Sequence, residues 1–158
     1  MSGTTSDVRW LSAEQQRHWR AFRDGVALLF DQLGHDLERC AGLSVHEYEV
    51  MVRLSEVPDR VLRMSQLAAD LAYSRSRLTH TIARMEAAGL VRRVACESDA
   101  RGVNCMLTEA GWQALVAAAP GHVESVRERL VDVLSDDELA ALGTAMAKVV
   151  ASVRGDEH

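Results

Sequence analysis

Arginine, serine, threonine and histidine side chains follow Ser74 at a spacing that lets them form hydrogen bonds with an anionic partner. When the segment is turned as a helix by about 100° per residue, apolar and polar residues separate onto opposite faces. Apart from its long basic arms, the polar face is small, which suits a helix entering the major groove of DNA, about 12 Å wide. The apolar face carries Leu78, Thr81, Ile82, Met85 and Ala88, and the polar face carries Ser76, Thr79, His80, Ala83, Arg84 and Ala87, with Arg77 at its border.

These side chains differ in the DNA groups that they can contact. Arg77 and Arg84 can reach guanine edges or phosphates, and His80 can donate or accept a hydrogen bond at a base. Ser74 and Ser76 begin the helix, where the positive end of its dipole favours a phosphate. A solvated helix face would have the same composition. The position of this helix directly after a short helix and before a hairpin favours DNA reading.

A polar turn, Asp99-Ala100-Arg101-Gly102, separates two short strand-like stretches after this helix. Arg101 at the tip of such an arm can enter the minor groove, where the potential is most negative. We expect Asp99 to orient Arg101 or an arginine of the preceding helix, and Arg92 and Arg93 to flank the DNA backbone. The alternative is an exposed ion pair in an ordinary turn, which contributes only ~0–1 kcal/mol.

The charge distribution supports a nucleic-acid partner although the chain has a net charge of −5. Residues 60–107 contain eight arginines and four acidic residues, a local charge of +4, whereas the rest of the chain carries −9. The field at a surface follows local charge more than total charge. A basic middle between acidic ends is therefore typical of a phosphate-binding surface.

The remaining pattern predicts mostly helices around this basic segment. Three serines followed three residues later by Gln or Glu form capping boxes, and two strand-like stretches flank the polar turn. The fold class is therefore mainly α with a small β-wing, a winged helix-turn-helix with long N- and C-terminal dimerisation helices. The expected elements are a helix from Ser12 to about Cys40, a helix from Ser44 to before Pro58, a strand at 62–64, a helix capped by Ser65, a helix from Ser74 to about Ala88, a hairpin over 90–96 and 102–107, a helix from Thr108 that is interrupted or bent at Pro120-Gly121, and a helix from Ser135.

The segment from Met64 to Gly111 resembles the MarR family of bacterial regulators. The resemblance rests on Met-Ser-Gln-Leu-Ala-Ala-Asp-Leu, Gly-Leu-Val-Arg-Arg, Asp-Ala-Arg-Gly and Leu-Thr-Glu-Ala-Gly, and it extends to Gly42-Leu-Ser-Val-His-Glu-Tyr-Glu-Val. It implies an obligate homodimer with intertwined end helices that binds a pseudo-palindromic duplex, usually as a repressor. Residues 44–108 would form the DNA-binding lobe, and residues 8–41 and 109–155 the dimerisation helices.

The helix pattern and the resemblance together predict a set of DNA-contacting residues and a second, smaller set for a ligand. The end helices carry more apolar side chains than helices on the surface of a monomer usually do. This also favours a dimer, although a single chain could bury these side chains by folding its ends together. The predicted DNA contacts are Ser65, Gln66, Ser74, Arg75, Ser76, Arg77, Thr79, His80, Arg84, Arg92, Arg93, Asp99 and Arg101. Many family members bind a small aromatic effector, for which Trp19, Phe22, His46 and Tyr48 are the candidate residues, with plain core packing as the alternative.

Other functions find little support in the residues. We find no phosphate-binding glycine loop, nucleophile elbow, HExxH motif or paired carboxylates, so we expect no enzyme activity, cofactor or metal. Cys96 and Cys105 fall on facing strands of the predicted hairpin, where they could form a disulfide or serve as small hydrophobic side chains. No apolar run is long enough to span a membrane, and the short polar N-terminus and odd number of cysteines favour the bacterial cytoplasm. A dimeric adaptor that does not touch DNA is the alternative function.

Overall fold

The computed structural model describes residues 8–96 and 102–155. Six α-helices, three short strands and two short irregular helices make up this part of the chain. The elements are α1 (Ala13–Ala41), α2 (Val45–Ser55), η1 (Pro58–Arg60), β1 (Val61–Arg63), α3 (Met64–Asp70), α4 (Arg75–Ala87), β2 (Val91–Ala95), β3 (Val103–Leu107), α5 (Glu109–Val126), the π-helical turn η2 (Arg127–Val131) and α6 (Asp136–Arg154).

The helix ends are determined by local side-chain caps. Ser12, Ser44 and Ser135 each form a complete capping box with the Gln or Glu three residues later, as the sequence predicted. At the other end of α1, Gly42 has φ 64°, a left-handed conformation that glycine adopts without steric cost. These signals confirm the predicted starts of α1, α2 and α6.

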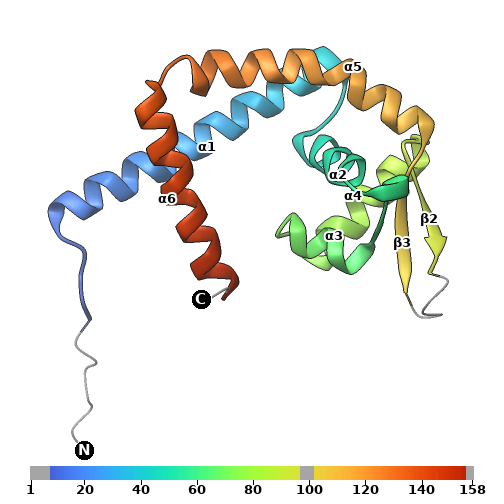
Figure 1. The fold of residues 1–158 in the computed structure, drawn as a ribbon, viewed down its shortest axis with the longest axis horizontal. Coiled ribbons are helices and arrows are strands. Elements are labelled where there is room, and N and C mark those ends of the chain that lie inside the picture. The colour runs from blue at the N-terminus through green and yellow to red at the C-terminus, as the bar shows by residue number, and fades with distance from the viewer. Residues whose placement is uncertain (1–7, 97–101, 156–158) are drawn as a thin grey trace, which may run out of the picture.

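The elements form a reading lobe and an arm (Figure 1). Helices α2, α3 and α4 and the strands form the reading lobe, while α1 and α5 run side by side above it and α6 descends from the far end of the arm. The sheet is antiparallel in the order β1-β3-β2, with Arg63 opposite Asn104 and Arg93 opposite Cys105. Two helices followed by this hairpin confirm the predicted winged helix-turn-helix.

The core lies where the reading lobe meets α5. Its most buried side chains come from α2, α3, α4 and the sheet, and those of α5 complete it. Burying such side chains is the main favourable term in folding. The fully buried members include Val50, Met51, Leu54, Leu67, Ile82, Met85 and Cys105.

The Leu-Thr-x-x-Gly motif joins the sheet to α5. The Thr108 hydroxyl accepts from Gly111 N at 3.0 Å and lies 2.6 Å from the carbonyl oxygen of Gly89. A Cβ at Gly111 would lie only 2.1 Å from the carbonyl oxygen of Leu90. Glycine is therefore required here because the first turn of α5 packs directly on the backbone that enters β2.

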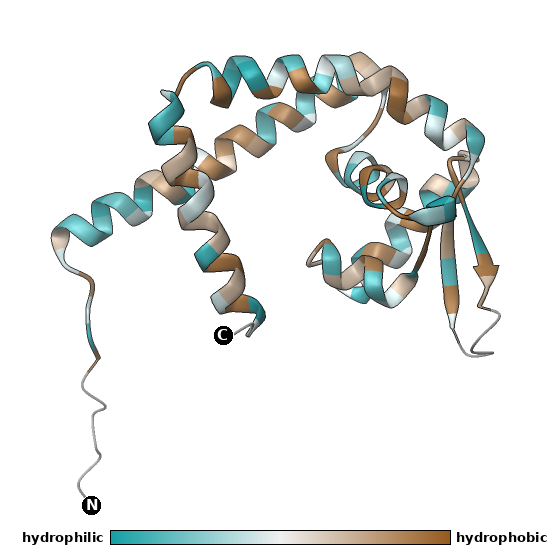
Figure 2. Cartoon of the chain, viewed as in Figure 1, coloured by the Kyte–Doolittle hydropathy of each residue, from teal (hydrophilic) through white to brown (hydrophobic). Residues whose placement is uncertain are grey.

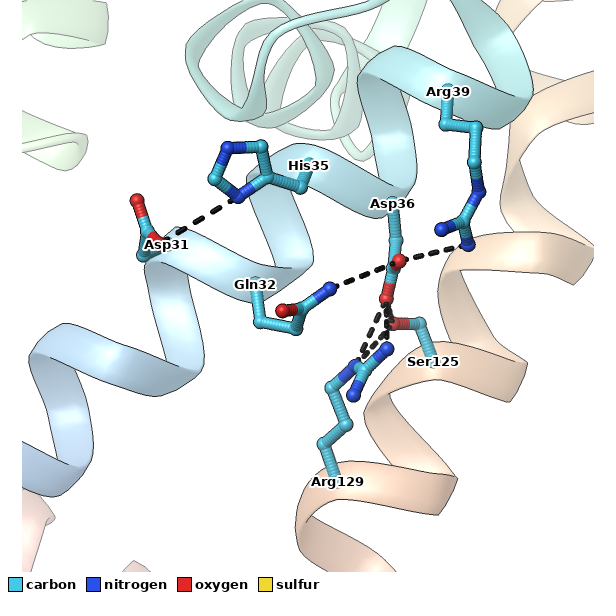
Figure 3. A network of polar contacts seen from close by, with 7 residues as sticks. All are labelled: Asp31, Gln32, His35, Asp36, Arg39, Ser125 and Arg129. Atoms are coloured by element: carbon cyan, nitrogen blue, oxygen red, sulfur yellow. Dashed lines mark hydrogen bonds and ion pairs between the residues drawn. The ribbon is translucent and has the colours of Figure 1, made fainter.

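A buried carboxylate fastens α1 to the end of α5 (Figure 3). Asp36 Oδ2 accepts from Ser125 Oγ at 2.6 Å and from Arg129 Nε at 2.9 Å, while Oδ1 accepts from Arg39 Nη2 at 2.8 Å. These hydrogen bonds, first of all that from Ser125, lower the pKa of Asp36 from 3.8 to about 2. Arg129 lies on the π-helical turn η2, so the network also secures this irregular end of α5.

Three local predictions were wrong. Helix α3 begins at Met64 and has no side-chain cap, so Ser65 lies inside the helix. Helix α5 is not interrupted at Pro120, and the irregular turn comes later, at η2. Pro120 and Val116 are both exposed, so water can bind the carbonyl that the proline leaves without a donor. Ala88, which we placed beside the apolar face of α4, is exposed.

Large apolar side chains of α1 and α6 remain uncovered within one chain. Hydrophobic residues recur along α6 and the middle of α1 (Figure 2), yet α6 has no buried residue. Within the described residues, no helix is sufficiently long and apolar to cross a membrane. We call the following residues the end-helix surface: Trp19, Phe22, Val26, Phe30, Val149, Val150 and Val153, which are 38–81% exposed.

Candidate nucleic-acid interface

Helix α4 presents a polar face to solvent while its opposite face is in the core. Leu78, Thr81, Ile82 and Met85 are buried, as the helical pattern predicted. The helix begins at Ser74, whose hydroxyl accepts from the backbone N–H of Arg77 at 3.2 Å. We call the exposed residues of α4 the reading face: Arg75, Ser76, Arg77, Thr79, His80, Ala83, Arg84 and Ala87.

Two of the predicted DNA-contacting arginines form ion pairs inside the protein. Arg84 Nη2 lies 2.9 Å from Oε1 of Glu47, which is buried on the first turn of α2. Arg93 Nη1 lies 3.0 Å from Oε2 of Glu86, and its backbone N–H donates to the same carboxylate. Arg84 therefore connects α4 to α2, and Arg93 connects β2 to α4. The other two arginines of α4 are Arg75 and Arg77.

The remaining predicted contacts lie on elements next to the reading face. Ser65 and Gln66 are exposed on α3, where Gln66 Nε2 donates to Asp70 at 2.7 Å. Arg92 is exposed on β2, on the same side of the sheet as Met106. Asp99 and Arg101 lie outside the described residues.

A notch of about 390 Å³ separates α4 from the base of the wing. Arg63, Ser65, Arg75 and Thr79 are among the residues that line it. Sequence analysis missed Arg63 because it lies on a three-residue strand that shows no periodic pattern. Its position opposite Arg75 adds a second basic side chain to this notch, which is a suitable place for a phosphate.

A hydrogen-bonded cluster that sequence analysis did not predict lies below the start of α4. The Tyr73 hydroxyl donates to Glu49, and His46 Nδ1 lies 2.6 Å from the same hydroxyl oxygen. The Arg77 guanidinium is 5.6 Å from the centroid of the Tyr73 ring. Burial and the Glu49 carboxylate raise the pKa of Tyr73, so the hydroxyl keeps its proton and remains a donor.

Two cavities adjoin α2, and the four predicted ligand residues are divided between them and the surface. Phe22 and Tyr48 line an open cavity of about 960 Å³, to which α1, α2, α5 and α6 contribute side chains. His46 lines a neighbouring cavity of about 590 Å³, and Glu49 lines both. Trp19 is 51% exposed on α1, with its ring 6.1 Å from that of Phe22.

His122 also lines the larger cavity. Its ring lies 4.4 Å from the Tyr48 ring, and burial lowers its pKa, so the imidazole is neutral near pH 7. Its Nδ1 atom is buried and has no hydrogen-bond partner among the described residues. Apolar side chains make up most of the cavity wall, and Glu49, Arg53, Glu56 and Arg129 line it together with the His122 ring.

The cysteine pair is too far apart for a disulfide. Cys105 is opposite Arg93, whereas Cys96 N donates to the Gly102 carbonyl three positions along β3. Three residues of a strand span roughly 10 Å, beyond the reach of a disulfide. Burial raises the pKa of Cys105 to about 12, so this thiol stays protonated in the core. Within the described ranges, no group of three His, Cys, Asp or Glu side chains could hold a metal ion.

Comparison with known proteins finds similarity over nearly the whole chain. The profile of the MarR family matches residues 41–102. A crystal structure of Sco3205, a MarR family transcriptional regulator from Streptomyces coelicolor in complex with DNA, is 41% identical, covers 93% of this chain and 92% of its own, and has a TM-score of 0.89. AbsC, a MarR family transcriptional regulator of the same organism, is 42% identical over 94% of this chain and 99% of its own, with a TM-score of 0.88. The HTH-type transcriptional regulator PecS of Dickeya dadantii (strain 3937) is 29% identical over 78% of this chain and 75% of its own.

Proposed function

The chain belongs to the MarR family of transcriptional regulators, and on this basis we propose that it is a homodimeric repressor that binds a specific pseudo-palindromic duplex. It is a DNA-binding transcription regulator, which we place in the bacterial cytoplasm and which acts by binding rather than by catalysis. Residues 44–108 are proposed to read DNA, and residues 8–41 and 109–155 to form the dimer.

The observation that carries this proposal is the reading face of α4. Its buried side belongs to the core, so the position of the exposed side is fixed relative to the rest of the lobe. Arg75 and Arg77 extend from its first turn, followed by Thr79 and His80. Side chains of this kind can donate to base edges and phosphates in the major groove.

The end-helix surface supports the homodimer. Phe22 and Phe30 of α1 are 38% and 50% exposed, and Val149 and Val150 of α6 are 50% and 48% exposed. Large apolar side chains left exposed together on two helices are typical of a protein interface. Two-fold symmetry then places two copies of α4 about one helical turn of DNA apart, ~34 Å.

The test is binding to duplex DNA taken from upstream of the protein's own gene, measured by fluorescence anisotropy at several salt concentrations. We expect specific binding that weakens steeply with salt, because bound arginines release counterions. Equal affinity for a random duplex would contradict sequence-specific binding. An absence of binding to either duplex at low salt would favour the adaptor function.

The larger cavity supports a second proposal, that a small aromatic effector binds beside α2. Its volume of about 960 Å³ falls within the range of ligand pockets, roughly 300–1,000 Å³. His122 offers a neutral imidazole, to which an uncharged hydroxyl compound can donate. Phenol should therefore raise the melting temperature of the protein, and His122→Phe should reduce this shift. An equal shift with both proteins would contradict a role for His122.

A further inference from the structure

The turn that leads into α4 is held by a side chain that contacts both α2 and the reading face. Tyr73 directly precedes Ser74, the capping residue of α4. The Tyr73 hydroxyl donates to Glu49, which leaves its oxygen free to accept from Nδ1–H of His46. His46 and Glu49 are three positions apart on α2, so one side of that helix holds the tyrosine.

The same tyrosine ring supports an arginine of the reading face. The Arg77 guanidinium lies 5.6 Å from the ring centroid, within the distance at which a cation is attracted to an aromatic face. The Tyr73 and His46 rings meet nearly perpendicular, at 82°, with centroids 5.0 Å apart. The direction of the ring, and with it the surface available to Arg77, is therefore set from α2.

A second connection between α2 and α4 has a different character. Glu47 accepts from Arg84 through Oε1, and its Oε2 accepts from Ser44 N and Ser44 Oγ, both at 2.9 Å. Glu47 is 8% exposed, and these contacts stabilise the start of α2 or hold the last turn of α4. The Tyr73–Glu49 bond instead acts at the end of α4 that carries Arg75 and Arg77.

We propose that Tyr73 and Glu49 are positioning residues for DNA recognition, which hold Arg77 in the direction required to read a base. This inference rests on the proposed function, since it concerns how the same reading face distinguishes its operator from other DNA. Loss of the hydroxyl bond would leave a ring that can turn, and Arg77 would then sample orientations that fit no particular base edge. Contacts of other residues to phosphates would be unaffected.

The experiment compares affinity for the operator duplex with affinity for a random duplex, using the full-length protein. Tyr73→Phe keeps the ring and removes only the hydroxyl, and Glu49→Leu removes the acceptor. Glu56→Leu is the matched control, because Glu56 follows the same helix and pairs locally with Arg53. It makes the same change of charge without touching Tyr73.

We expect Tyr73→Phe and Glu49→Leu each to lower the operator-to-random affinity ratio by about 3- to 10-fold, as loss of one hydrogen bond implies. The double variant should be no worse than either single variant, and Tyr73→Phe should have no further effect in an Arg77→Gln background. Glu56→Leu should leave the ratio unchanged.

Several results would overturn the inference. If the two residues have only a structural role, the variants should melt at a lower temperature and bind both duplexes more weakly by the same factor, with no change in the affinity ratio. If the fold-losses of the affinity ratio in the two single variants multiply in the double variant, the two residues act separately. If the wild-type protein itself has a ratio of one, the proposed function fails and this inference fails with it. An unchanged ratio in Tyr73→Phe beside a specific wild-type protein contradicts the inference alone.

Discussion

The Nη2 atom of Arg84 lies 2.9 Å from Oε1 of Glu47, so an arginine of the reading face is tied to the first turn of α2. Arg77, about two helical turns earlier on α4, has its guanidinium beside an aromatic ring instead of a carboxylate. The two arginines therefore have different parts in the protein although both are exposed on one helix.

Changing Arg84 or Arg77 to glutamine should have different effects on DNA affinity and on stability. Arg77→Gln should weaken operator binding about tenfold or more, the value of one lost base contact. Arg84→Gln should lower the free energy of unfolding by up to about 1 kcal/mol, since the pair is partly exposed, and change operator affinity less than threefold. Urea unfolding and anisotropy measure the two effects. A large loss of affinity in Arg84→Gln would show that Arg84 leaves Glu47 to contact DNA.

Arg92 on the wing should act through phosphates. Because phosphate contacts are independent of sequence, Arg92→Gln should weaken operator and random duplexes by the same factor and reduce the salt slope of log affinity by about 1. Arg20→Gln on α1 is the control, and its slope should equal that of the wild-type protein. A change in sequence preference with Arg92→Gln would instead assign a base contact to this residue.

The end-helix surface should be required for both assembly and DNA binding. Phe22→Asp places a charge in the proposed interface, so the protein should become monomeric in light scattering. Operator affinity should fall by about 10²-fold or more, because the second half-site no longer benefits from linkage. Val103→Asp alters a valine of β3 that is 45% exposed and lies in the reading lobe, outside the proposed dimer helices, and this variant should remain dimeric. A Phe22→Asp protein that stays dimeric would contradict the interface.

Two glycines of α5 should respond oppositely to alanine. Gly111→Ala should lower the free energy of unfolding by about 1–3 kcal/mol, because the added Cβ meets the Leu90 carbonyl oxygen at 2.1 Å. Gly121→Ala should raise it by about 0.5–1 kcal/mol, since nothing lies within 4 Å and alanine favours the helix. Chemical denaturation of both variants measures this difference. A neutral Gly111→Ala would mean that α5 can move away from β2 at little cost.

The Asp36 network should make the stability of the protein depend on pH in the acidic range. Its carboxyl has a folded-state pKa of about 2, below the usual 3.8, so its stabilising effect is present above pH 4 and is lost as pH falls towards 2. Asp36→Asn should therefore melt at a lower temperature than the wild-type protein at pH 6, and the gap should narrow between pH 4 and pH 2. A gap that is constant over this range would exclude the ionised carboxylate as its cause.

Much of the secondary structure could be predicted from the sequence because its signals are local. The capping boxes of Ser12, Ser44 and Ser135 join residues three positions apart, within one helical turn. The two faces of α4 follow from helical periodicity in the same way. The helix break that Pro120 could have caused does not occur, and the sequence could not decide this because exposure, which determines whether water can replace a lost backbone bond, is a property of the whole fold.

What the sequence determined by itself was a set of helices with polar and apolar faces, a wing and a basic middle, and these suffice to indicate a winged helix-turn-helix. Only the tertiary structure decided which of its charged and polar groups are paired. The partners Tyr73 and Glu49 are 24 positions apart, Arg84 and Glu47 are 37 apart, and Arg129 and Asp36 are 93 apart. Such pairs form when helices pack, and no periodic pattern records them. For that reason the sequence could assign Arg77 and Arg84 to one face of a helix, but not distinguish their roles.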